Sequence, residues 1–371
     1  MSSENKPLVS LVVPIYNVER YVEECVKSCR NQTMKNIEII CVDDCSTDKS
    51  LEIVQRMAKR DSRIKIVTKP KNAGYGNTMN LGFDAAKGEY IGIAESDDYI
   101  APDMCQYLYD RAKKYNLDVI KADYLTFRTK NGKDCTEYEA TCTDPKYYNH
   151  VLVPEETKEM FVFQMNTWTG IYRADFIRKN NIRHNETPGA SYQDNGFWFQ
   201  TLSLAKRVMF VDRAFYHYRQ DNPNSSINSK GKVFCMNDEF KFIHDFVMAH
   251  EEVKENFMFE YFRKKFFNYM HTYGRIADEY KLPFLERFAQ ELKETQESGE
   301  INFAKMEDEW LRNMSSRIMD DYELFYYEDT IYRLEQELGN AKWRLETLKN
   351  CQQMKVGRST ADSIRKMIGK A

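Results

Sequence analysis

Apolar, β-prone runs alternate with amphipathic stretches over the first third of the chain. The predicted strands are residues 8–13, 37–42, 64–67, 90–94 and 118–122, and the predicted helices are residues 18–30, 48–60, 76–86 and 103–115. Acids, prolines and glycines punctuate the ends of these strands. This alternation predicts an α/β fold, in which helices cover both faces of a mostly parallel sheet.

The rest of the chain predicts less regular segments and then long helices. Residues 123–154 are polar and rich in tyrosine, which indicates a loop or a sheet edge, and residues 155–164 predict a helix. Residues 236–303 predict long helices with an aromatic core, formed by Phe259, Phe262, Phe266, Tyr269 and Tyr273 at helical spacing. We expect a first domain over residues 1–230, with halves 8–122 and 123–230, and a helical domain over residues 231–328.

A seam of apolar residues marks the last expected segment, residues 329–371. It consists of Ile331, Leu334, Leu338, Ala341, Leu345 and Leu348, which recur at alternating steps of three and four. This heptad pattern favours a short coiled coil, and therefore a homo-oligomer formed through residues 331–348. An amphipathic helix packed on its own domain explains the same spacing.

The C-terminal residues 355–371 are basic, with five Lys and Arg side chains against one Asp. Ile364, Met367 and Ile368 lie close to one face of a predicted helix. A basic amphipathic helix can lie on an anionic membrane surface, and a disordered basic tail explains the same residues.

Net charge and hydropathy exclude several classes of protein. The net charge of −3 over 371 residues gives no reason to expect a nucleic-acid partner. No apolar run approaches 18 residues, and the first residues do not resemble a signal peptide. The sequence therefore predicts a cytoplasmic protein, with peripheral contact at the inner face of the membrane as the expected form of membrane association.

The most informative acids directly follow the strand predicted at residues 90–94. They are part of the run Glu95, Ser96, Asp97 and Asp98, and open α/β sheets bind ligands at the carboxyl ends of their strands. Carboxylates are hard oxygen ligands suited to Mg²⁺ or Mn²⁺, which in turn hold phosphates. The alternative is a solvated turn in which an aspartate caps the next helix.

Polar groups and glycines also follow the first three predicted strands. They are Pro14, Tyr16 and Asn17 after the first strand, Asp43 and Asp44 after the second, and Asn72, Gly74 and Asn80 after the third. A carboxylate can accept a hydrogen bond from the N3–H of a pyrimidine or from a ribose hydroxyl. The glycine-rich stretch 72–82 does not match G-x-G-x-x-G, which disfavours a Rossmann dinucleotide site.

Taken in order, these segments resemble the large family 2 of inverting nucleotide-sugar glycosyltransferases, which has the GT-A fold. The resemblance covers residues 8–220, and residues 95–98 fall where that family carries its Asp-x-Asp metal motif. The resemblance implies that Asp194 is the catalytic base, and a helix N-cap is the structural alternative for this residue. It further places Trp168, Gln193 and Trp198 on the acceptor side, and residues 216–226 near the diphosphate.

The same resemblance implies an activity and its ligands. The implied enzyme depends on Mn²⁺ or Mg²⁺ and moves a sugar from a UDP-sugar to a hydroxyl of a glycan or lipid-linked acceptor, in the synthesis of surface polysaccharide or glycolipid. The implied nucleotide-sugar ligands are Pro14, Tyr16, Asn17, Asp43, Asp44, Asn72, Gly74, Asn80, Ser96 and Asp97, and the implied metal ligands are Asp97 and Glu95.

Three residues depart from the family pattern. Glu95 is one methylene longer than aspartate, Met79 stands where many members have arginine, and Gln193 replaces a glutamate beside the base. These departures keep a second interpretation open, in which a catalytically degenerate nucleotide-sugar-binding domain acts as an assembly partner. A nucleotidyltransferase is disfavoured, because residues 14–17 offer no glycine-rich, cationic phosphate loop after the first strand.

Overall fold

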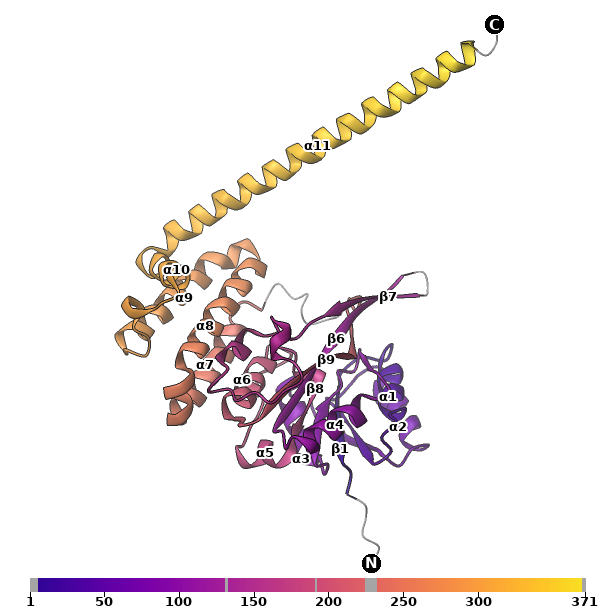
Figure 1. Cartoon of the computed structure of the whole chain (residues 1–371), viewed down its shortest axis with the longest axis vertical. Helices are drawn as coiled ribbons and strands as arrows, with labels where there is room; N and C mark the ends of the chain where they lie inside the picture. The colour runs from indigo at the N-terminus through magenta and orange to yellow at the C-terminus, as the bar shows by residue number, and fades with distance from the viewer. Residues whose placement is uncertain (1–5, 131–132, 191, 224–231, 369–371) are drawn as a thin grey trace, which may run out of the picture. The chain divides into compact units, whose positions relative to one another are not determined.

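The chain divides into two compact units, Met1–Ile276 and Ala277–Ala371 (Figure 1). The structure is a computed structural model, and it describes residues 6–130, 133–190, 192–223 and 232–368. The first unit carries a single mixed sheet with its helices, and the second is helical in its described residues.

Four parallel strands form the N-terminal half of the sheet, in the order β3–β2–β1–β4. They are Val9–Ile15 (β1), Ile37–Asp43 (β2), Ile64–Thr68 (β3) and Tyr90–Ile93 (β4). Every residue of β1 and β2 is buried, because both faces of these strands are covered. Strands that are buried on both faces appear in the sequence as continuous apolar runs. The first four strands predicted from such runs are confirmed as β1 to β4.

Beyond β4 the sheet is mixed, in the order β4–β8–β6–β9–β5. These strands are Gly170–Arg173 (β8), Val119–Lys130 (β6), Val208–Arg219 (β9) and Tyr99–Ile100 (β5). β8 runs antiparallel to both neighbours, whereas β6 and β9 are parallel. Lys133–Glu139 (β7) pairs with β6 alone among the described strands and forms a sheet edge, which is one of the two alternatives expected for this polar segment. Residues 123–130 instead continue β6, between β7 and β9.

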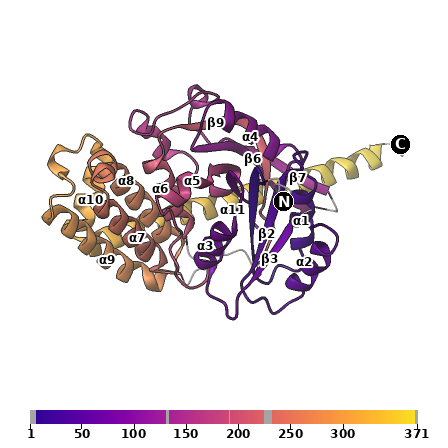
Figure 2. The ribbon, with the colours of Figure 1, turned by 90° about the horizontal axis from the view of Figure 1, so that it is seen from below.

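Helices cover both faces of the first half of the sheet (Figures 1 and 2). Val22–Arg30 (α1), Ser50–Ala58 (α2) and Met104–Lys114 (α4) share one apolar core with Leu11 and Val13 of β1. Val12 points to the opposite face, since side chains alternate along a strand, and lies against Gly82 of Tyr75–Ala85 (α3). The predicted arrangement of helices on both faces is therefore confirmed.

The helix predicted over residues 155–164 is wrong in its extent. Lys158–Val162 (η2) is a 3-10 helix within this segment. Phe161 packs on Trp198, whereas Phe163 packs on Phe210. Phe161 and Phe163 are two residues apart and pack against different partners. In a continuous α-helix, residues that share a buried face are spaced three to four positions apart, so this pattern does not suit an α-helix.

The first unit is completed by further short elements and two long helices. They are Pro145–Tyr147 (η1), Thr167–Thr169 (η3), Ala174–Lys179 (α5), Asp194–Leu204 (α6), Cys235–Ala249 (α7) and Glu251–Arg275 (α8). Both α7 and α8 contact α6, so the helical segment expected to begin at residue 231 starts inside this unit. Phe262, Phe266, Tyr269 and Tyr273 are buried as expected, and Phe259 is exposed.

The second unit contains Asp278–Glu297 (α9), Phe303–Lys305 (η5), Glu309–Asp320 (α10) and Tyr322–Ile368 (α11). Residues 369–371 of the predicted basic segment, and all side chains from 351 onward, lie outside the described part of the chain. Within the part that is described, no helix is both long enough and apolar enough to cross a bilayer.

Candidate functional site

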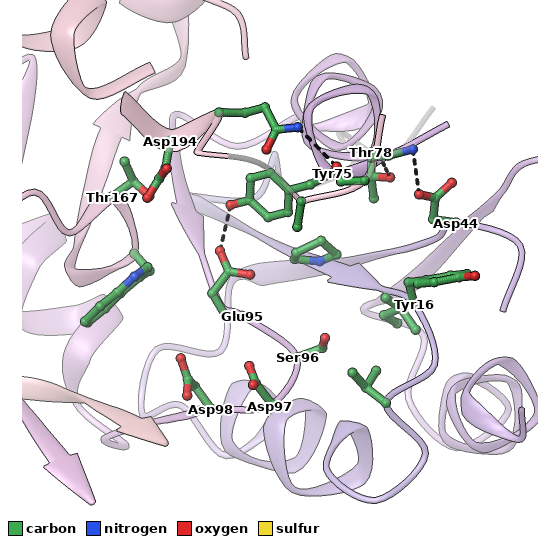
Figure 3. A pocket seen from close by; sticks show the side chains of 18 of the residues that line it. Tyr16, Asp44, Tyr75, Thr78, Glu95, Ser96, Asp97, Asp98, Thr167 and Asp194 are labelled. Carbon is green, nitrogen blue, oxygen red and sulfur yellow. Dashed lines mark hydrogen bonds between the residues drawn. The ribbon is translucent and has the colours of Figure 1, made fainter. Parts of the chain in front are cut away.

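The carboxyl ends of β1, β2 and β4 open into one pocket of about 610 Å³, a volume typical of small-molecule sites. The predicted site residues that line it are Pro14, Tyr16, Asp44, Asn72, Gly74, Glu95, Ser96, Asp97, Trp168, Gln193 and Asp194. Figure 3 shows Asp44 and Tyr16 at one end, Asp194 beside Thr167 at the other, and Glu95 between the two ends. We call this cavity the strand-end pocket.

Asp44 is held in a buried network at one end of this pocket. Its Oδ2 accepts a hydrogen bond from the backbone N–H of Gly74 at 2.9 Å, and its Oδ1 lies 2.7 Å from Nζ of Lys69. The side chains of Asp44 and Lys69 are each only 5% exposed. Lys69 also donates to Asn77 and Thr78 of α3. An ion pair therefore fixes the end of β2 against the start of α3.

The glycines at the start of α3 allow a close approach of two backbone segments. Gly74 has φ +87°, and a Cβ there would lie 2.7 Å from the carbonyl oxygen of Thr187. A Cβ on Gly76 would overlap the carbonyl oxygen of Asn185. The segment 185–189 leads to Asp194, so this packing joins the two ends of the pocket.

Gly76→Ala is expected to lower the free energy of unfolding by about 1–3 kcal/mol, because the backbone at Asn185 must move to admit the methyl group. Thermal and denaturant unfolding measure this effect. Gly274→Ala is the matched control, since a Cβ at Gly274 in α8 meets nothing within 4 Å. Equal stability of Gly76→Ala and the wild type would contradict the packing described here.

The acids after β4 differ in their surroundings. Tyr75 donates a hydrogen bond of 2.7 Å to Glu95, and Asn222 donates one of 2.8 Å to Asp97. Burial raises the pKa of Glu95 to about 8, an effect that the hydrogen bond from Tyr75 opposes and the charges of Asp97 and Asp194 increase. Asp98 is buried, accepts a hydrogen bond from the backbone N–H at position 219, and has a pKa raised by burial.

Glu95 and Asp97 are the residues that could hold a divalent cation. The described residues include no ready-made cluster of three or more His, Cys, Asp or Glu side chains for a metal. Mg²⁺ needs only one or two carboxylates where substrate phosphates and water complete its coordination. None of the described lining residues is Lys, Arg or His, so none of these side chains offers a positive charge to a diphosphate. This donor set fits a divalent cation that binds together with a phosphate group.

Asp194 is the first residue of α6 and lines the pocket with a partly exposed side chain. Burial raises its pKa, and hydrogen bonds from the backbone together with the charge of Lys264 oppose this rise. Thr167 lies beside it in Figure 3, and the Thr167 hydroxyl is buried with no hydrogen-bond partner in the described structure. The Asp194 carboxylate is therefore placed to take up a proton from a ligand in the pocket.

Gln193 and Trp168 shape the pocket near Asp194. The Gln193 amide donates to the hydroxyl of Thr187 at 2.9 Å and to the carbonyl of Gly189 at 3.1 Å, so it holds the segment that leads to Asp194. Trp168 stacks on Tyr218, with ring centroids 5.2 Å apart and planes at 13°. This aromatic wall provides a flat apolar surface of the kind that can support a sugar ring or an apolar acceptor.

Four predicted site residues lie outside the pocket lining and contact protein groups instead. Asn17 accepts hydrogen bonds from Thr47, and the buried Asp43 accepts one from the backbone N–H of Ser46. Asn80 forms hydrogen bonds with the backbone of His184. Trp198 is buried beside Phe161. Met79 is also fully buried outside the lining. Position 79 does not face the pocket, so having methionine there instead of arginine removes no cation from the pocket lining. A different residue, Lys69, places a positive charge beside Asp44.

Several lining residues were not predicted as site residues from the sequence. They are Ile15, Val18, Tyr75, Thr78, Thr167, Gly189, Ala190, Tyr192, Tyr218 and Asn222. Asp98, which the sequence singled out together with Glu95 and Asp97, also lines the pocket. Tyr218 and Asn222 belong to the segment 216–226 that the family resemblance singled out, and Ser225 and Ser226 of this segment lie outside the described residues. Tyr192 has φ +70°, an uncommon conformation for a bulky residue, and it directly precedes Gln193 and Asp194.

Comparison with known proteins identifies the family of this chain. Residues 10–181 match the family described as glycosyl transferase family 2. An uncharacterized glycosyltransferase of Haemophilus influenzae is 44% identical over 240 residues, which cover 64% of this chain and 89% of that protein. The uncharacterized glycosyltransferase EpsJ of Bacillus subtilis is 35% identical over 225 residues, or 59% of this chain and 62% of EpsJ. The chain thus matches less than two thirds of the length of EpsJ.

Solved structures agree with the fold. The crystal structure of S. aureus TarS 1-349 in complex with UDP-GlcNAc superposes with a TM-score of 0.55 at 19% identity, over 77% of this chain and 81% of the TarS chain. This similarity confirms the GT-A-like architecture predicted from the sequence. With a relative that is 44% identical and matched over 89% of its length, the chain belongs to glycosyltransferase family 2.

Proposed function

We propose that the protein is a metal-dependent, inverting glycosyltransferase that moves a sugar from a UDP-sugar to an acceptor hydroxyl. The observation that carries this proposal is the convergence of Asp44, Asp97 and Asp194 in one pocket. A donor, its leaving diphosphate and an acceptor each need a polar group there, and these three carboxylates come from three separate parts of the chain.

The donor's nucleoside is proposed to lie at the end of the pocket formed by Asp44, Tyr16, Asn72 and Gly74. Tyr16 is exposed and offers a ring on which a base can stack, while the buried Asp44 is fixed by Lys69. TarS, which has a similar fold, has been crystallised with UDP-GlcNAc, and this supports a UDP-sugar as the donor class.

The diphosphate is proposed to lie over Glu95, Ser96 and Asp97. A divalent cation, Mg²⁺ or Mn²⁺, would neutralise the leaving group when bound, since no cationic side chain occurs among the described lining residues. Asp97 is held by Asn222, and Glu95 by Tyr75, so both carboxylates are oriented before a ligand arrives.

The acceptor is proposed to enter beside Trp168, with its reacting hydroxyl at Asp194. As general base, the Asp194 carboxylate takes the proton of that hydroxyl while the new glycosidic bond forms and the bond to the diphosphate breaks. We propose a glycan or a lipid-linked acceptor in surface-polysaccharide or glycolipid synthesis, as the family resemblance implies.

Inversion of configuration is the chemical test of this proposal. NMR of the product formed from an α-linked UDP-sugar should show a β-glycosidic bond when a transferable acceptor is supplied. An α-linked product would contradict direct displacement assisted by a single base.

The rate of transfer should depend on pH through Asp194. Burial raises the pKa of this carboxyl above its ordinary range, and only the ionised form accepts a proton. Activity should therefore fall as the pH is lowered, starting at a higher pH than for a solvent-exposed aspartate. The pH profile of kcat/KM measures this, and a profile whose acid limb lies at the ordinary aspartate pKa would contradict a raised pKa for the base.

A nucleotide-sugar-binding domain without turnover is the second candidate. Gln193 favours it, because its amide is engaged with Thr187 and Gly189 in place of a second carboxylate beside Asp194. This candidate predicts calorimetric binding of UDP-sugars with no release of UDP.

A further inference from the structure

The long helix α11 exposes a continuous apolar seam, which we define as Ile331, Leu334, Leu338, Ala341, Leu345 and Leu348. The five Leu and Ile residues of the seam are 54–63% exposed, and Ala341 is exposed as well. The seam spans about 26 Å at the rise of an α-helix. Contiguous exposed apolar surface of this kind commonly marks an interaction site.

The part of α11 that carries the seam has little intrinsic stability as an isolated helix. Gly339 lies in the middle of the seam, and a Cβ there would meet nothing within 4 Å. Glycine in the interior of a helix lowers the stability of that helix. Most of the stability of a helix in a protein comes from packing of its apolar face. A second helix packed on the seam would provide this stabilisation.

The charges that flank the seam indicate which helix packs on it. They fall at the two heptad positions that border a coiled-coil core, and they are acidic before the middle of the seam and basic after it: Glu328, Glu335, Glu337, Lys342, Arg344 and Lys349. A helix with this division of charge is complementary to a copy of itself that runs in the opposite direction.

We propose that α11 forms an antiparallel two-stranded coiled coil with the same helix of a second copy of the chain. In the register centred between residues 339 and 340, Ile331 packs on Leu348 of the partner subunit. In the same register, Leu338 packs on Ala341 of the partner subunit. The core of the seam is then apolar throughout.

The same register pairs every flanking acid with a base. Glu335 faces Lys342 of the partner subunit, and Glu337 faces Arg344 of the partner subunit. Glu328 faces Lys349 of the partner subunit. Because the dimer is two-fold symmetric, each pair occurs twice.

Other arrangements of two copies bring like charges together. In a parallel pair, Glu337 faces Lys342 of the partner subunit, but two like-charged pairs form as well. Glu323 faces Glu328 of the partner subunit, and Arg344 faces Lys349 of the partner subunit. An antiparallel pair shifted by one heptad places Glu335 against Glu335 of the partner subunit, or Lys342 against Lys342 of the partner subunit. The charge pattern therefore selects both the direction and the register, by disfavouring the alternatives.

The oligomeric state of the full chain tests the seam itself. Sedimentation equilibrium over a concentration series should show a monomer–dimer equilibrium. Leu338→Glu should weaken the dimer by about 100-fold, since two charges enter an apolar contact. Trp343→Glu is the matched control, because Trp343 is 67% exposed but lies on the opposite face of the helix, and it should leave the dimer intact.

Charge reversal tests the direction. Glu335→Lys should weaken the dimer about tenfold in the antiparallel arrangement, because the introduced ammonium group would face Lys342 of the partner subunit twice per dimer. The double variant Glu335→Lys/Lys342→Glu should recover the wild-type affinity. In a parallel dimer the same double variant would instead weaken association, because residue 342 would carry a glutamate facing Glu337 of the partner subunit.

Circular dichroism and the melting temperature of each variant show that folding is preserved, as expected for exposed positions. A chain that stays monomeric at all concentrations would overturn the proposal. So would a dimer that is unaffected by Leu338→Glu, or one that the double charge reversal weakens. The test is independent of glycosyl transfer.

Discussion

Asp194→Asn is expected to lower the rate of sugar transfer by about 10²–10⁴-fold, the range lost when a general base is removed. The amide has nearly the shape of the carboxylate but does not accept the acceptor proton. The affinity for the donor should change little, because Asp194 lies at the opposite end of the pocket from Asp44 (Figure 3). Steady-state kinetics with saturating donor and acceptor separate kcat from donor binding.

Asp175→Asn provides the matched control for this variant. Asp175 also stands in the first turn of a helix, α5, but its side chain is 88% exposed and lies outside the pocket lining. It should leave kcat unchanged. If Asp194→Asn kept near-normal turnover with its fold intact, Asp194 would be a structural residue and the base would lie elsewhere.

Lys69→Met is expected to have the largest effect on stability, lowering the free energy of unfolding by about 3–5 kcal/mol. The substitution leaves the buried carboxylate of Asp44 without its partner at 2.7 Å. It also removes the donor to Asn77 and Thr78, which tie β3 to α3. Urea unfolding measures the loss, and donor binding should weaken with it because the pocket end at Asp44 is no longer fixed.

Two further variants separate the ion pair from general effects of charge removal. Lys71→Met removes an exposed lysine from the same loop and should change stability by less than about 0.5 kcal/mol. Lys69→Met/Asp44→Asn should recover part of the lost stability, because the buried charge is removed along with its partner. A single Lys69→Met variant as stable as Lys71→Met would contradict a buried ion pair.

The first half of the fold could be predicted from the sequence because parallel strands covered on both faces leave an unmistakable pattern. β1 and β2 are buried at every position, so their apolar runs and the turns after them show clearly. β5 has only two residues and exists because it pairs with β9, more than one hundred positions later. Such a strand has no local signal, and neither does the antiparallel direction of β8.

The site was predictable where it depends on strand ends, and less so where it depends on tertiary contacts. Asp44 and Asp97 follow buried strands, and both reach the pocket. Asn222 binds Asp97 across 125 positions of sequence, and no spacing rule connects such residues. Met79 shows the reverse case: position 79 differs from the family pattern, but the side chain is buried away from the pocket.

The central claim is that the strand-end pocket activates a UDP-sugar with the help of a divalent cation. Release of UDP from a panel of UDP-sugars, with Mn²⁺ or Mg²⁺ and then with excess chelator, tests it most directly. We expect release that is selective for one donor, abolished by chelator and lost in Asp97→Ala, while calorimetry with UDP still reports binding through Asp44. Release that persists in chelator, or that Asp97→Ala leaves unchanged, would contradict the account.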